Sequence, residues 1–375
     1  MSKILEFTWN NQHLKNTKAP SLVSIQVKFL ADSLRIKDLS LNFGKNHKGI
    51  RKAIQDQHWT KIGETIGRSC PNCGFQHLLG FYQALEQAFN INNLIPLEGQ
   101  LARIVFLEWS RVGYYIHKVI NILINSGINN LASHLRELLG RYYEFPRILT
   151  GQRDLSPSNI FQLGGIGIKI SPSVEGEANV LLDSLMKDFE IIFKKIRKNR
   201  SLKQHLRGVG DVFPGKSVLY NPTGITGRST GLLRDIRLSD PKNGYEQIVI
   251  PLITPIVPNH DLYGLFLRYN QELRQSLQII KSILLNHHLE ETNAMIDIED
   301  LGKESSEAWV RLEGLTGECN YYIKVGENQI VKDFVWETST LTNWPMFRLR
   351  ALGRPVQKIN ALFDTADFCF YCAEE

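Results

Sequence analysis

Residues 97–125 read LEGQLARIVFLEWSRVGYYIHKVINILIN and form the longest helical pattern in the chain. Apolar residues recur around most of the circumference that a helix of this sequence would have. A helix that is apolar on nearly all sides is surrounded by other elements. The pattern therefore predicts a buried central helix around which the rest of the fold packs.

Further helices are predicted on both sides of this segment. Apolar residues that recur with the helical period identify them, and they cover about residues 75–89, 128–141, 176–198, 261–286 and 344–352. The glycine-rich stretch 208–241 separates two of these helices and is predicted to be mostly loop.

Strands are predicted near both ends of the chain. Residues 22–42 alternate between apolar and polar side chains around a turn at Asp32-Ser33, which is typical of a half-buried hairpin. Further strands are predicted at 307–313, 320–325 and 329–336. The fold class is therefore α+β and mainly helical, with an N-terminal antiparallel sheet and a smaller amount of β-structure in the C-terminal half.

The organisation of the chain indicates one domain over residues 1–375. We find no internal repeat and no low-complexity linker that would divide it. Within this domain we expect a sheet at 20–45, a helical core at 46–300, and a β-segment with a terminal cysteine motif at 301–375.

The composition excludes several classes of protein. Hydrophobic residues make up 43% of the chain and charged residues 22%, which is ordinary for a globular protein. The net charge of +6 is dispersed, so no nucleic-acid partner is predicted. The sequence shows neither a signal-peptide core nor an apolar run of about 18 to 20 residues. We therefore expect a cytoplasmic protein, in which disulfides rarely persist.

Four of the five cysteines form two pairs with the same spacing. Cys70 and Cys73 lie near the start of the first long helix, and Cys369 and Cys372 lie at the end of the chain. Each pair could be a redox dithiol, half of a metal site or two buried thiols. If the pairs converge, four thiolates suit zinc, an iron–sulfur cluster or nickel. Cys319 stands alone and is interpreted as a core thiol.

The residues around the cysteines resemble those of a known family. Arg68-x-Cys70-x-x-Cys73-x-x-x-His77 resembles the N-terminal metal motif of NiFe-hydrogenase large subunits, and Asp367-x-Cys369-x-x-Cys372 resembles the C-terminal one. The segments HLLGFYQALEQAFNI, IPLEGQLARIVFLEWSRV, GVGDVFPGKSVLYNPTGITGRSTGLLRDIRLSDPKNGY and LEGLTGECNYYIKVGENQI are similar to segments of the complex-I-related membrane-bound hydrogenases and of the 49-kDa subunit of NADH–quinone oxidoreductase. The resemblance covers residues 20–375 and implies the large-subunit fold of that group.

The resemblance also implies a metal centre. Cys70 and Cys369 would be terminal nickel ligands, while Cys73 and Cys372 would bridge nickel to an iron that carries cyanide and carbon monoxide. Magnesium is a further cofactor that the resemblance allows, and zinc is the alternative metal.

Residues next to the cysteines also receive roles from the resemblance. His77 would form a hydrogen bond with a bridging sulfur, and Arg68 would supply positive charge that favours thiolates. His47 would match a histidine of the quinone pocket.

Three positions depart from the family pattern. HKGIRK at 47–52 places Arg51 where the family has a glutamate proton relay, and a guanidinium stays protonated at neutral pH. EGLTGE at 313–318 places Thr316 where the family has an arginine above the open metal position. The sequence ends at Glu375 without an extension, so no maturation protease is expected. Hydrogen turnover is therefore predicted to be weak or absent.

Three functions compete at this point. The first is the large subunit of a complex-I-like, hydrogenase-like oxidoreductase that works with an iron–sulfur small subunit and membrane-integral subunits on the cytoplasmic face of the inner membrane. The second is a quinone-reactive subunit like the 49-kDa protein, and the third is a structural or assembly protein with zinc in the four-cysteine site.

Overall fold

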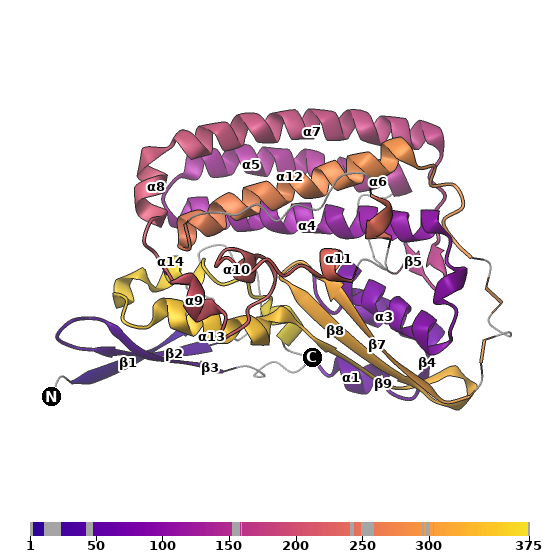
Figure 1. The fold of residues 1–375 in the computed structure, drawn as a ribbon, viewed down its shortest axis with the longest axis horizontal. Helices are drawn as coiled ribbons and strands as arrows, with labels where there is room; N and C mark the ends of the chain where they lie inside the picture. The colour runs from indigo at the N-terminus through magenta and orange to yellow at the C-terminus, as the bar shows by residue number, and fades with distance from the viewer. Residues whose placement is uncertain are drawn as a thin grey trace.

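The computed structural model describes residues 3–10, 24–42, 48–151, 158, 160–240, 244–248, 259–294, 296–297, 301–302 and 304–373. Helices α4, α5, α7 and α12 pack against one another and form a helical layer, and α3, the sheets and the C-terminal segment lie along one side of it (Figure 1). The long helices are α3 (Gly74–Ala88), α4 (Leu97–Asn125), α5 (Asn129–Tyr142), α7 (Pro172–Lys198) and α12 (Leu262–Asn286).

The central helix is α4, as its sequence predicts. Most of its residues are buried, and it packs against α12 and α5. Gly113 allows α5 to come close, because a Cβ atom at this position would meet the hydroxyl oxygen of Tyr142 at 2.5 Å. Tyr142 also stacks on the ring of Trp109 with a centroid distance of 4.3 Å. These close aromatic contacts fix the position of α4 against α5.

Shorter helices connect these long ones and the sheets. The predicted loop region 208–241 contains three of them, each of four or five residues. The short helices are α1 (Ile50–Ile54), α2 (Gly63–Gly67), α6 (Glu144–Thr150), α8 (Arg200–Leu206), α9 (Pro214–Ser217), α10 (Gly224–Arg228), α11 (Ile236–Ser239), α13 (Ser339–Ala351) and α14 (Ile359–Phe363).

The N-terminal sheet contains one more strand than the sequence pattern predicted. The expected hairpin is present as β2 (Ser24–Leu30) and β3 (Ile36–Asn42), which pair antiparallel. In addition β1 (Ile4–Asn10) pairs with the free edge of β2. Ile25 and Val27 of the hairpin are fully buried, so the alternation correctly indicated the inward face.

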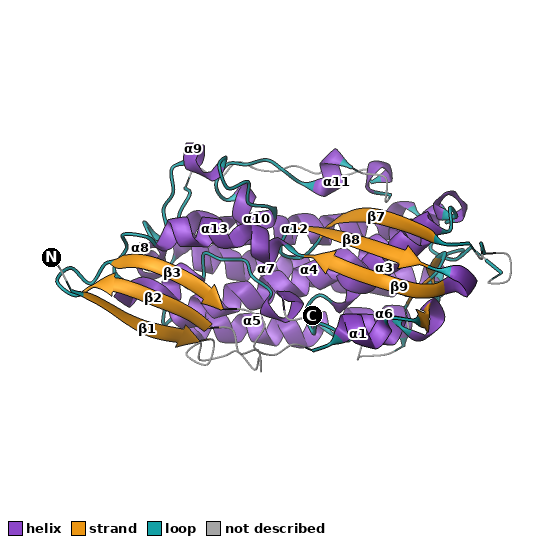
Figure 2. Cartoon of the chain, turned by 90° about the horizontal axis from the view of Figure 1, so that it is seen from below, coloured by secondary structure: helices purple, strands orange, loops and turns teal. Residues whose placement is uncertain are grey.

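A second antiparallel sheet has the strand order β4-β9-β8-β7 and contains the three strands predicted near the C-terminus. Helix α3 packs on β7 and β8. Figure 2 shows the two large sheets on the same side of the helical layer, with the end of the chain between them. The strands are β4 (Gln57–His58), β7 (Ser306–Glu313), β8 (Glu318–Val325) and β9 (Ile330–Glu337), and β5 (Phe161–Gln162) with β6 (Gly165–Ile166) forms a small separate pair.

Candidate metal centre

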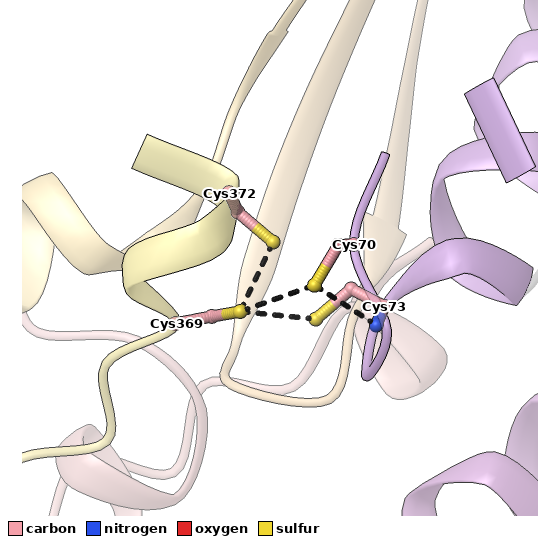
Figure 3. A group of neighbouring side chains, drawn as sticks. All are labelled: Cys70, Cys73, Cys369 and Cys372. Carbon is pink, nitrogen blue, oxygen red and sulfur yellow. Dashed lines mark hydrogen bonds between the residues drawn. The ribbon is translucent and has the colours of Figure 1, made fainter. Parts of the chain in front are cut away.

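The two cysteine pairs converge, although they lie at opposite ends of the sequence (Figure 3). The Sγ atom of Cys369 lies 3.4 Å from that of Cys70, 3.6 Å from that of Cys73 and 3.2 Å from that of Cys372. All four Sγ atoms lie within 4.8 Å of one another, and all four residues are buried. The two motifs therefore meet, as the metal centre implied by the resemblance requires.

The first pair is positioned by the beginning of α3. Cys73 is the residue before the first turn of this helix, and its backbone N–H donates to Cys70 Sγ at 3.3 Å. The positive end of the helix macrodipole points toward this pair and favours negative charge on sulfur. The helix start thus supplies both the short turn between the two cysteines and electrostatic support for thiolates.

The second pair is held by the beginning of α13. The Thr340 hydroxyl accepts a hydrogen bond from the Cys369 backbone N–H at 3.1 Å and donates one to the Cys369 carbonyl at 3.3 Å. The 3₁₀ turn Phe370–Ala373 then brings Cys372 back toward Cys369, and their backbones are bonded at 3.2 Å. The terminal motif is therefore a structured turn that presents both sulfurs inward.

His77 lies beside the second pair, as the resemblance implied. It is fully buried on α3, with its Nε2 atom 3.0 Å from Cys372 Sγ and its Nδ1 atom 3.2 Å from the Tyr321 hydroxyl. Its ring packs on the indole of Trp336 with a centroid distance of 4.9 Å. Burial lowers the pKa of His77 to about 4, so its imidazole is neutral at physiological pH.

Lys48 is the cation that joins the two motifs, and the sequence reasoning missed it. Its Nζ atom donates to the carbonyl of Ser69 at 3.0 Å and to the carbonyl of Tyr371. Ser69 precedes Cys70 and Tyr371 precedes Cys372. One side chain thus holds both turns, and only the fold reveals it because no sequence motif links Lys48 to the terminal pair.

Hydrogen bonds among the four sulfurs favour a thiolate at one of them. Hydrogen bonds from Cys372, Cys70 and Cys73 lower the pKa of Cys369 well below that of an ordinary thiol. The pKa of Cys73 is raised chiefly by its hydrogen bond to Cys369, and that of Cys372 is raised chiefly by burial. Four buried thiolates would repel one another, so positive charge at the centre is needed to keep all of them deprotonated.

The other predicted site residues occupy different surroundings. The guanidinium of Arg51 on α1 forms a two-pronged pair with Asp333, with N–O distances of 2.8 and 2.6 Å, and its side chain is 56% exposed. Arg68 pairs with Glu64 at 2.8 Å and is 69% exposed, so its charge lies at the surface, whereas Lys48 donates to backbone carbonyls in both motifs. His47 lies outside the described residues.

Thr316 lies inside the protein, in the turn between β7 and β8. Its hydroxyl accepts a hydrogen bond of 2.6 Å from Ser339, the residue before Thr340. Cys319 is fully buried at the start of β8, which agrees with its interpretation as a core thiol.

Asp367 is a buried carboxyl group that the motif contained without an assigned role. Its Oδ1 atom accepts a hydrogen bond of 2.5 Å from Tyr114 and lies 3.2 Å from Lys118 Nζ, both on α4. Burial raises its pKa. The carboxyl group thus ties the terminal motif to the central helix.

Comparison with known proteins gives a consistent result. The family model described as the 49 Kd subunit of respiratory-chain NADH dehydrogenase matches residues 131–308. The chain is 24% identical over 246 residues to an NADH-quinone oxidoreductase subunit of Nitratiruptor sp., covering 65% of this chain and 58% of that one. It is 26% identical over 288 residues to the protein of the same name from Pelagibacter ubique, covering 67% and 70%. The chain is therefore similar to the 49-kDa subunit of NADH dehydrogenase over part of its length.

The fold of the chain also occurs in a solved respiratory complex. A chain of the membrane-bound sulfane sulfur reductase, an archaeal respiratory membrane complex, superposes with a TM-score of 0.86 at 18% identity, covering 99% of this chain and 98% of that one. The predicted fold class is therefore confirmed. The chain spans 58% of the length of its Nitratiruptor relative, so the two sequences match over only part of the longer protein.

The geometry of the four cysteine sulfurs fits a metal ion. Four thiolates bonded to one tetrahedral zinc ion at about 2.3 Å lie about 3.8 Å from one another. The three sulfur–sulfur distances at Cys369, from 3.2 to 3.6 Å, are only slightly shorter. A small outward movement of the side chains makes room for an ion, and the all-sulfur donor set suits soft metals.

Proposed function

We propose that the chain is the metal-bearing large subunit of a complex-I-like oxidoreductase in a membrane-bound respiratory assembly. The relatives named above support this proposal, because NADH-quinone oxidoreductase and the sulfane sulfur reductase are both respiratory enzymes. The single observation that carries it is the convergence of four buried cysteine sulfurs within 4.8 Å. A large subunit that serves only as a scaffold has no need of this arrangement.

The proposed cofactor is a nickel–iron centre held by Cys70, Cys73, Cys369 and Cys372. Such a centre, when bound, supplies redox chemistry and Lewis acidity. The chain contributes the thiolates, the buried surroundings that exclude water, and the Lys48 ammonium that joins the two motifs. Positive charge from Lys48 and from the start of α3 stabilises negative sulfur, which is what a multiply charged metal–thiolate group requires.

We propose that hydrogen turnover by this site is weak or absent. Efficient hydrogen cleavage requires a base to take the proton and a positioned cation. Arg51 is paired with Asp333 at the surface, and Thr316 is hydrogen-bonded to Ser339. Neither residue offers a carboxylate base or a cation to the sulfurs, so the substrate is expected to differ from that of ordinary hydrogenases.

An iron–sulfur small subunit is the proposed electron partner. The metal ligands are buried, and the fifth cysteine, Cys319, is too isolated to build a cluster. Electrons must therefore pass to a separate carrier. Among the described helices none is both long enough and apolar enough to cross a bilayer. We propose that membrane-integral subunits hold the chain at the cytoplasmic face of the inner membrane.

Two other functions have specific support. A quinone-reactive role is favoured by the NADH-quinone oxidoreductase relatives, and this role does not require metal at the cysteines. A structural zinc site is favoured by the compactness of the sulfur group, whose spacing is close to that around a single ion.

Purification from the native host tests the proposed partner. The chain is isolated at its natural expression level through an affinity tag, and the co-purifying proteins and their electron paramagnetic resonance signals are recorded. We expect a stoichiometric iron–sulfur protein together with membrane proteins. A stable monomer with no iron–sulfur protein attached would exclude the proposed subunit role.

A further inference from the structure

A chain of hydrogen bonds leads from a backbone amide to the cysteine site through His77. We infer that Gln76 and Tyr321 are positioning residues that fix the proton of His77 on Nε2, so that this N–H donates to Cys372 Sγ. The importance of this donor for a metal-bound sulfur rests on the proposed metal centre, but the placement of the proton does not.

The direction of these hydrogen bonds is fixed at the end of the series that lies farthest from the cysteines. The backbone N–H of Leu315 can only donate, and it lies 2.8 Å from the Oε1 atom of Gln76. This contact fixes which end of the amide is oxygen, an assignment that is otherwise uncertain for glutamine. The Nε2 atom of Gln76 therefore faces Tyr321 and donates to its hydroxyl oxygen at 3.1 Å.

The contacts of Tyr321 then determine the direction of its hydrogen bond with the histidine. Because the hydroxyl oxygen accepts from Gln76, its own proton is available to the Nδ1 atom of His77 at 3.2 Å. A nitrogen that accepts a hydrogen bond carries no proton, so a neutral imidazole bears its proton on Nε2. That atom lies 3.0 Å from Cys372 Sγ.

The contacts at the cysteine end of this hydrogen-bond series indicate the same direction. The Cys372 thiol donates its single proton to Cys369 Sγ at 3.2 Å. Cys372 therefore has no second proton for His77 and can only accept from it. In the other tautomer the lone pair of Nε2 would point at a sulfur that has nothing to donate, which is costly in a buried site.

Close packing prevents the two positioning residues from turning away. A Cβ atom at Gly80 would lie 2.6 Å from the ring of Tyr321, and one at Gly314 would lie 2.4 Å from Gln76 Oε1. Only glycine leaves room for these side chains. Arg111 on α4 also donates to the Gly314 carbonyl at 2.6 Å, which holds the turn that carries Leu315.

As a consequence, the Nε2–H group of His77 always donates to Cys372 Sγ. A hydrogen bond donated to a thiolate stabilises its negative charge, and outer residues of this kind typically change metal affinity by about 10- to 100-fold when they are replaced. Gln76 and Tyr321 therefore act on the sulfur through His77, without touching the metal themselves.

Nitrogen NMR on the reduced, metal-free protein tests the placement of the proton. Two-bond proton–nitrogen correlations on 15N-labelled protein distinguish protonated from unprotonated ring nitrogens, and His77→Gln identifies the signal. We expect a protonated Nε2 and an unprotonated Nδ1. A proton on Nδ1 in the unmodified protein would overturn the inference.

Variants then test the roles of the two positioning residues. Tyr321→Phe keeps the ring but removes the donor, so His77 is expected to lose its single tautomer. Gln76→Glu turns the hydroxyl of Tyr321 toward a carboxylate and is expected to act in the same way. The matched control is Tyr322→Phe, because that hydroxyl bonds Glu307 at the surface. An unchanged His77 signal in folded Tyr321→Phe and Gln76→Glu proteins would contradict the inference.

Cobalt(II) provides a second readout that separates this inference from the proposed function. The sulfur-to-cobalt charge-transfer band is expected to move to lower energy in Tyr321→Phe and to stay in place in Tyr322→Phe. If cobalt binds with the same band in both variants, the effect on sulfur is absent and the inference fails. If cobalt does not bind while the NMR result holds, the proposed metal centre fails and the positioning of His77 stands.

Discussion

Lys48 and Arg51 are only three positions apart in the sequence, but the fold gives them different surroundings. Lys48 donates to backbone carbonyls in both cysteine motifs, whereas Arg51 forms a pair with Asp333 on β9. The resemblance drew attention to Arg51 and Arg68 because it compares positions along the chain. Contacts between the two ends of the chain become visible only in three dimensions, and for this reason Lys48 was missed.

Replacing Lys48 is expected to weaken metal binding. Lys48→Gln removes the charge beside both motifs, and we expect the affinity for zinc or cobalt to fall by about 10- to 100-fold, as measured by competition with a chelator. The matched control is Arg51→Gln, which removes a nearby cation that pairs with Asp333. Equal affinities in the two variants would show that Lys48 has no special role.

Metal binding is also expected to depend on pH. The pKa values of Cys73 and Cys372 are raised, so both thiols carry protons at neutral pH. A bound metal displaces these protons, and affinity therefore rises with pH by about tenfold per unit for each proton released. Cobalt titrations between pH 6 and pH 8 measure this slope, and a flat profile would contradict the assigned protonation.

Hydrogen–deuterium exchange measures the proposed loss of hydrogen turnover. We expect nickel-loaded protein to be slower than ordinary hydrogenases by about a hundredfold to ten-thousandfold, which is the usual cost of a missing general base. Arg51→Glu combined with Asp333→Asn restores a carboxylate without placing it beside another one, and is expected to gain activity over Asp333→Asn alone. Exchange at ordinary rates in the unmodified protein would show that the proton leaves by another route.

At the scale of elements, buried ion pairs join α4, α10, α11 and α12 to β7. Arg228 on α10 binds both carboxylate oxygens of Glu272 on α12 at 2.7 Å and Glu313 on β7 at 2.7 Å. Glu108 on α4 receives hydrogen bonds from Arg237 on α11 and from other residues. The network borders the turn that carries Leu315, so it links the helical layer to the candidate site.

The sequence predicted the helices and strands better than it predicted the buried ion pairs. The predicted bounds 97–125 are those of α4, because its apolar pattern is continuous. Helix α13 begins at Ser339, before the predicted start at 344, and includes Pro345. Strand β1 was not predicted, although it is as long as β2. Charged residues in a glycine-rich stretch suggest a solvated loop, so the burial of Arg228 and Arg237 could not be predicted from their sequence context.

Replacing one member of the buried ion-pair network is expected to lower the free energy of unfolding. Glu272→Gln leaves Arg228 without one of its buried partners, and we expect a loss of about 3–5 kcal/mol in the free energy of unfolding. Arg274→Gln on the same helix is the control, since its pair with Glu190 is 47% and 41% exposed and exposed pairs contribute less than about 1 kcal/mol. Denaturant titration compares the two, and similar losses would contradict a structural role for the network.

At the scale of the whole molecule, the cysteine site closes the chain on itself. The terminal segment 366–373 reaches α3 through Cys369 and Cys372, and the Lys48 contact to Tyr371 supports it. The resemblance predicted this closure from paired motifs alone. It could not predict how Thr340 and Asp367 fix the segment, because these contacts depend on α13 and α4.

Metal removal is therefore expected to loosen the end of the chain. Amide hydrogen exchange in residues 366–373 should become faster after treatment with a chelator, because the bonds that join the two motifs are lost. Residues 101–123 of α4 serve as the internal control and should not change. Equal protection of the terminal segment with and without metal would show that the metal does not hold the two ends together.

The most direct test of a four-cysteine metal centre is metal analysis combined with X-ray absorption at the metal edge. Protein made with its native maturation machinery is compared with a Cys369→Ser, Cys372→Ser variant. We predict nickel and iron in equal amounts with sulfur ligands to nickel, and loss of both metals in the variant. Zinc alone with four sulfur ligands would select the structural alternative. Protein without metal, or with metal content that survives the double substitution, would contradict the account.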